Sequence, residues 1–89
     1  MDKIPFPVIR PEDYDAFFRL TDGDLPDTHN KWLDLDTKSR RKRREQGTEV
    51  VEVKVHPHEF AVFCKAHNVP ANQKTLADFA MHEYRTKGK

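Results

Sequence analysis

A short alternating stretch in the middle of the chain most constrains what the chain can fold into. Over residues 50–55, valine at every second position alternates with Glu52 and Lys54. A period of two in β-branched residues is typical of a strand with one buried face and one face in water. Pro57 follows, and it has no N–H for a strand ladder but suits the first turn of a helix. Because a lone strand cannot satisfy its own backbone hydrogen bonds, the partner of this strand decides the architecture.

The proline-rich segment 4–9 is one candidate partner for this strand. Pro5 and Pro7 are two residues apart, so their missing N–H groups would lie on one edge, whereas Phe6 and Val8 would present theirs on the other. An edge strand tolerates proline in this pattern. The strand 50–55 therefore pairs either with this edge strand or with a strand of a second chain, and in the second case residues 4–9 form an extended arm.

Four helices are predicted around the strand. The segments are marked by proline or a polar cap at the start and by apolar residues at helical spacing, and the first three also have acidic residues near the start. The expected helices are 11–20, with Tyr14, Phe17 and Phe18 buried; 24–46; 57–68, with Asn68 as a left-handed C-cap; and 73–85, with Asn72 as N-cap and Leu76, Phe79, Ala80 and Tyr84 buried.

The second of these helices changes character along its length. Asp24 is expected to cap it, with Pro26 in its first turn. Its apolar stripe is expected to consist of Trp32, Leu33 and Leu35. Residues 36–46 include no apolar residue, yet most of them are good helix formers. The last turns are therefore expected to extend into solvent, and Gly47 is expected to end the helix.

Length and composition predict one small α+β domain spanning residues 1–89. The chain has 36% apolar residues, 35% charged residues and a net charge of +1, so its core is small. Its expected parts are an arm or edge strand (1–10), two helices ending in a basic solvated turn (11–46) and a strand–helix–helix unit (47–89). No run approaches the ~20 apolar residues of a membrane span, and no signal-peptide core is present. Cys64, the only cysteine, excludes an internal disulfide. We expect a soluble, cytoplasmic protein with no membrane partner.

Charge is concentrated in one block. Residues 1–36 carry nine acids and four bases, whereas residues 37–47 carry six bases and one acid. The basic block consists of Lys38, Arg40, Arg41, Lys42, Arg43 and Arg44. Charge of one sign steers association and selects partners. The sequence thus predicts a non-catalytic interaction module that binds through the basic block and the polar strand face around Lys54. Its ligand is a protein partner or the acidic front, residues 1–36, of a second copy.

Nucleic-acid binding is a second hypothesis from the same residues. The basic block could contact several phosphates and give a salt-dependent affinity. In addition, the order strand, proline, helix, corner, helix over residues 50–84 resembles the ribbon-helix-helix DNA-binding domains. That resemblance implies a dimer whose paired strands lie in the major groove, with Glu52, Lys54 and His56 facing the bases.

Neither a metal centre nor a catalytic site is predicted. The possible zinc ligands are His56, His58, Cys64 and His67. His58 and His67 lie about 13 Å apart on one helix at ~1.5 Å per residue, too far for one ion. Cys64 and His67 form the only thiol–imidazole pair, and the neighbouring Phe60 places the thiol on the core face, where it would be inert. We expect no catalytic residue, no metal and no cofactor.

Overall fold

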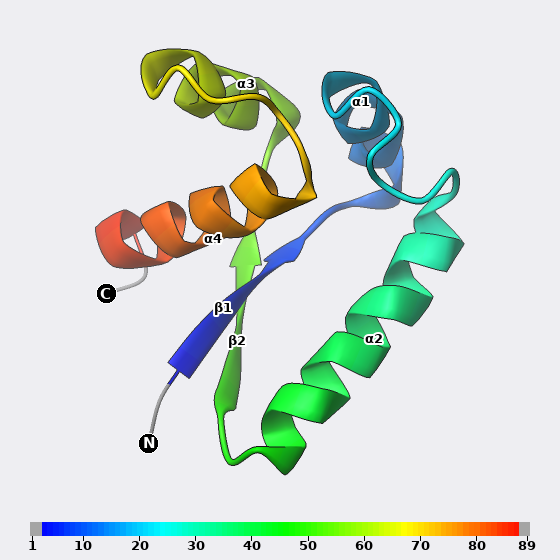
Figure 1. Cartoon of the computed structure of the whole chain (residues 1–89), viewed down its shortest axis with the longest axis vertical. Coiled ribbons are helices and arrows are strands. Elements are labelled where there is room, and N and C mark those ends of the chain that lie inside the picture. The colour runs from blue at the N-terminus through cyan, green and yellow to red at the C-terminus, as the bar shows by residue number, and fades with distance from the viewer. Residues whose placement is uncertain (1–2, 88–89) are drawn as a thin grey trace.

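The computed structural model describes residues 3–87 as four helices and a two-stranded parallel sheet (Figure 1). The elements in chain order are β1 (Lys3–Val8), α1 (Pro11–Leu20), α2 (His29–Glu45), β2 (Glu49–Lys54), α3 (Pro57–Ala66) and α4 (Gln73–Lys87). This arrangement confirms the predicted small α+β fold of four helices around a strand.

The central strand β2 pairs with β1 of the same chain, in parallel. The N–H of Val55 donates to the carbonyl of Val8 at 3.2 Å. The N–H and C=O of one strand residue point to the same edge, and this edge alternates from one residue to the next. The backbone groups of Val8 therefore point to β2. Both prolines are an odd number of residues from Val8 and therefore face the outer edge. The predicted edge strand is confirmed, and its prolines lie where no ladder N–H is required.

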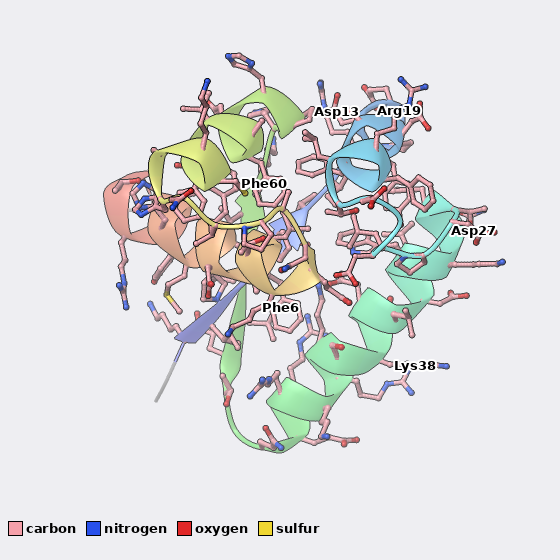
Figure 2. All side chains as sticks on the ribbon, turned by 45° about the horizontal axis from the view of Figure 1, so that its top comes forward. Phe6, Asp13, Arg19, Asp27, Lys38 and Phe60 are labelled. Carbon is pink, nitrogen blue, oxygen red and sulfur yellow. The ribbon has the colours of Figure 1, made fainter. Side chains whose placement is uncertain are left out.

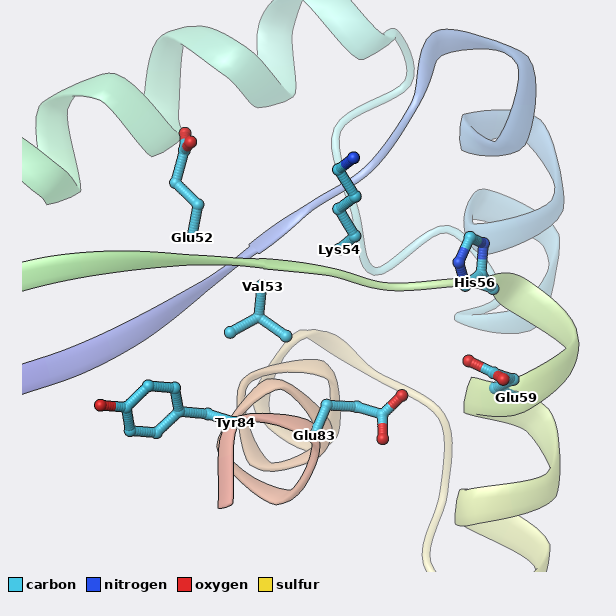
Figure 3. A pocket seen from close by; sticks show the side chains of 7 residues that line it. All are labelled: Glu52, Val53, Lys54, His56, Glu59, Glu83 and Tyr84. Atoms are coloured by element: carbon cyan, nitrogen blue, oxygen red, sulfur yellow. The ribbon is translucent and has the colours of Figure 1, made fainter. Parts of the chain in front are cut away.

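Helices cover both faces of this sheet. In Figure 3, Glu52 projects from β2 toward α2, while the next residue, Val53, projects toward α4. Figure 1 shows α4 crossing the strands, with α1 and α3 beyond the end of β2. The core lies where α1, α3 and α4 meet that end of the strand. The largest of its fully buried side chains are Phe17, Phe60, Leu76 and Val55.

Three helices end in the same way, with a residue in the left-handed region. These residues are Asp22 (φ 53°), Gly47 (φ 82°) and Asn68 (φ 53°). After α2, the N–H of Gly47 donates to the carbonyl of Arg44, and the N–H of Thr48 donates to that of Arg43. This pairing satisfies carbonyls that the helix leaves free. The predicted helix ends at Gly47 and Asn68 are confirmed.

The predicted start of α2 is wrong. The helix begins at His29 rather than near Asp24, and its N-cap is Thr28, whose hydroxyl accepts from the N–H of Lys31 at 3.1 Å. The carboxylate of Asp24 instead accepts from the N–H of Gln73 at 2.8 Å, at the start of α4. Asp24 therefore satisfies a free N–H of a helix that lies 49 residues further along the chain.

The predicted apolar stripe of α2 is also only partly buried. Trp32 is buried, whereas Leu33 and Leu35 remain 39% and 48% exposed. Trp32 is the buried residue of α2, so Leu33 and Leu35 contribute little to the core. Phe18 and Tyr84, which were expected in the core, are half-buried at its margin.

Candidate functional site

The second half of α2 carries the basic block and is held against the sheet at one position, Arg40. Its Nε lies 2.7 Å from Asp36 Oδ2, one helical turn earlier. Its Nη1 donates to Glu52 Oε2 on β2, also at 2.7 Å. Its guanidinium stands 5.5 Å from the centre of the Phe6 ring on β1. Arg40 thus joins α2 to both strands.

Arg40 consequently differs from the rest of the basic block. Its side chain is only 13% exposed, and that of Asp36 is 10% exposed. Burial raises the pKa of Asp36 above the ordinary carboxyl value, although Arg40 acts in the opposite direction. Arg40 was expected to lie on the exposed binding surface; the structure instead places it between helix and sheet, where it neutralises a buried carboxylate.

The other five basic side chains form an exposed surface, here called the exposed block. Its members are Lys38, Arg41, Lys42, Arg43 and Arg44, all of them exposed. None of the five makes an ion pair with any residue between 3 and 87. In Figure 2, Lys38 projects away from the sheet. The three in the last turn lie at the negative end of the helix dipole, which stabilises cations there.

Lys54 does not join the exposed block. It is one of the residues that line a separate hollow of about 520 Å³ beside β2, together with His56, Glu59 and Tyr84. In Figure 3, its side chain projects from the side of β2 opposite Tyr84. The polar strand face is also partly occupied, because Glu52 binds Arg40. The two parts of the predicted binding surface are therefore distinct places on the molecule.

A groove at the outer edge of β1 was missed by the sequence analysis. It has a volume of about 470 Å³ and lies between residues 4–7 of β1, the first turns of α4 and one face of α2. That face runs at helical spacing from Trp32 through Leu35 and Ser39 to Lys42 and Arg43. The groove is thus apolar at one end and basic at the other. The spacing of these residues on one helix face was the available sequence signal.

A third hollow, of about 330 Å³, lies between α3 and α4 and is lined by three histidines, two of them packed on Phe63. The centre of the Phe63 ring is 4.4 Å from the centre of the His67 ring and 5.2 Å from that of the His82 ring. Among residues 3–87, no three His, Cys, Asp or Glu side chains converge closely enough to hold a metal ion. Cys64, which follows Phe63 on α3, is buried, and burial raises the pKa of its thiol.

None of the described helices has the length and apolar content needed to cross a membrane. Comparison with known proteins gave no further guide to the site: no protein-family model, curated protein or solved structure matches this chain.

Proposed function

We propose that this chain is a small, non-catalytic, cytoplasmic interaction module that binds an acidic protein partner through the exposed block of α2. One observation carries the proposal. Five cations stand together on one ordered helix, and no acid among the described residues neutralises them. Three bases before the block are paired with nearby acids: Arg10 with Asp13, Arg19 with Asp15 and Lys31 with Asp27.

The contacts that anchor α2 to the domain support this assignment. Trp32 is buried at one end of α2, and Arg40 holds the middle of the helix against both strands. A preorganised surface loses less conformational entropy when a partner binds. A cluster of like charges also raises the rate of association with an oppositely charged protein, in a manner that salt weakens.

The buried thiol supports a non-catalytic role. A reactive cysteine is partly exposed and lies in a surrounding that lowers its pKa. Cys64 is 6% exposed, and burial raises its pKa. An unpaired thiol of this kind also suits a reducing compartment such as the cytoplasm.

A charge-reversal experiment tests the proposal. Partners are captured from a lysate of the source cells, and the most enriched protein is then purified and titrated against the chain at two salt concentrations. The test variant reverses Arg41, Lys42 and Arg43 to Glu. The control variant makes the same change in net charge at the exposed Lys65, Lys74 and Arg85.

We expect the test variant to bind that purified partner at least about tenfold more weakly, which corresponds to a loss of ~1.4 kcal/mol or more of binding free energy. The control variant should keep most of the wild-type affinity, and salt should weaken the wild-type complex. Equal binding by the two variants would contradict the proposal. If the enriched partner is the chain itself, the acidic front of a second copy is the ligand.

Nucleic-acid binding is the second candidate, and the same unneutralised cations favour it. If the ligand is a nucleic acid, the logarithm of the binding constant should fall linearly with the logarithm of the salt concentration. The version based on a dimeric ribbon finds less support, because β2 already pairs with β1 and Glu52 binds Arg40. Titration of a labelled DNA duplex at low salt is the test, and absence of binding removes this candidate.

A further inference from the structure

The groove between β1, α2 and α4 combines features that one kind of ligand would match. We propose that it receives an amphipathic helix of the acidic partner, lying antiparallel to α2, with an apolar side chain against Leu35 and acidic side chains against Lys42 and Arg43. This inference rests on the proposed function and assigns the part of the surface that gives specificity.

The apolar end of the groove offers a place for a large side chain. Leu35 is 48% exposed although it lines the groove. The groove is also lined by Ile4 and Phe6 of β1 and by Ala77 of α4. Covering this surface would remove apolar area from water, which favours binding. A buried apolar anchor of this kind commonly carries most of the binding free energy of an interface.

The basic end of the groove requires an acidic ligand. Lys42 and Arg43 line it, and neither makes an ion pair with a described residue. The acid that also lines the groove, Asp36, is already paired with Arg40. The positive charge at this end is therefore uncompensated, and carboxylates are its natural complement.

A helix fits this groove better than a strand. A strand that binds to a sheet edge needs both N–H and C=O groups from that edge. Pro5 and Pro7 face the outer edge of β1 and supply no N–H. A docking segment that satisfies its own backbone, such as a helix, avoids this loss.

One distance along α2 defines the expected ligand. Leu35 and Lys42 are seven residues apart on α2, which corresponds to about 11 Å at ~1.5 Å per residue. An antiparallel partner helix would therefore carry acids in its first turn and an apolar residue about two turns later. The same orientation places acids at the positive end of their own helix, where they are favourable. A nucleic acid would match the basic end but has no apolar group for the end at Leu35.

A peptide selection tests this inference. Random peptides of about 16 residues, long enough for four turns at ~3.6 residues per turn, are displayed on phage and selected on the intact wild-type chain. The two test variants are Leu35→Asp and the double variant Lys42→Glu with Arg43→Glu. Their matched controls are Leu33→Asp, which is similarly exposed outside the groove, and Arg41→Glu with Arg44→Glu. Urea denaturation verifies that all four variants remain folded.

We expect enriched peptides to carry Asp or Glu about two helical turns before Leu, Phe or Trp. Leu35→Asp and the Lys42, Arg43 variant should each weaken their binding by about tenfold or more, and each matched control by less than about threefold. Failure to enrich any peptide overturns the inference, as does equal binding by Leu35→Asp and Leu33→Asp. So does a DNA duplex that displaces the peptides and binds Leu35→Asp as tightly as wild type.

The two proposals fail in different ways. If Leu35→Asp has no effect but the charge-reversal variant loses the captured partner, the groove is wrong and the proposed function stands. If the captured partner is indifferent to the charge reversal, the proposed function itself is wrong.

Discussion

Replacing Arg40 with methionine should destabilise the domain by about 2–3 kcal/mol at pH 7. Removing one partner of a fully buried ion pair costs ~3–5 kcal/mol, because the other charge is left unpaired in a poorly solvated place. The side chains of Arg40 and Asp36 are 13% and 10% exposed, so most of that cost applies. Glu52, the second partner of Arg40, is 68% exposed and can be hydrated instead, which keeps the cost below the upper limit. Methionine has a side chain of similar length but no charge, so it removes both ion pairs and the contact of the guanidinium with the Phe6 ring, and the measured loss reports the charge.

The free energy of unfolding from urea denaturation is the measurement. Since ~1 kcal/mol shifts the thermal midpoint of a domain of this size by about 4–8 °C, the midpoint should fall by roughly 10–20 °C. Arg41→Met, at an exposed position, controls for the loss of charge and should change stability by less than about 0.5 kcal/mol. The double variant Asp36→Leu with Arg40→Met should recover most of the loss, because the buried carboxylate is gone. If Arg40→Met is as stable as Arg41→Met, the assignment of Arg40 as a structural residue is refuted.

Three further predictions concern single side chains. Burial raises the folded-state pKa of Asp36, which means that folding favours the protonated carboxyl. The contribution of this group to the free energy of unfolding is therefore fully present below the unfolded pKa of about 3.9 and is lost as pH rises through the folded pKa. The free energy of unfolding of wild type, measured relative to Asp36→Asn, should therefore decrease as pH rises from about 4 toward 7; an increase would reverse the sign of the argument. The buried Cys64 should react with a disulfide reagent at pH 8 at least about a hundredfold more slowly in the native chain than in urea, and comparable rates would show that the thiol is accessible. Asp24→Ala should lower the free energy of unfolding by about 1 kcal/mol, because it removes the acceptor for the N–H of Gln73. Thr28→Ala, which removes the cap of α2, should cost as much. Hydrogen exchange should localise the Asp24 effect to the start of α4 and not to α2.

Local patterns were enough to predict most of the elements. Proline at the first helical position marks α1 and α3 at Pro11 and Pro57. The alternating valines mark β2, and the spacing of Pro5 and Pro7 indicates an edge strand. Each of these signals acts within a few residues, where the chain's own covalent geometry limits the choices.

The parts that could not be predicted depend on contacts between distant residues. Asp24 has the sequence surroundings of a helix cap, but its carboxylate accepts a hydrogen bond from the N–H of Gln73, 49 residues away. Arg40 is one of six similar residues in the sequence, and only the approach of β1 and β2 distinguishes it. A partial signal was available: Trp32, Asp36 and Arg40 are spaced four residues apart, so they share the face of α2 that turns inward.

The pairing of β1 with β2 has a consequence during synthesis of the chain. Each residue of β1 pairs with one about 46 positions later, such as Lys3 with Glu49, so at ~5–20 residues per second β1 waits about 2–9 s for its partner. During that time an unpaired apolar strand on one ribosome can pair with the same strand on a neighbouring nascent chain. Pro5 and Pro7 remove donors from one edge of β1, so such a pair could not propagate into a larger sheet. The two prolines therefore protect the unfinished chain as well as the folded one.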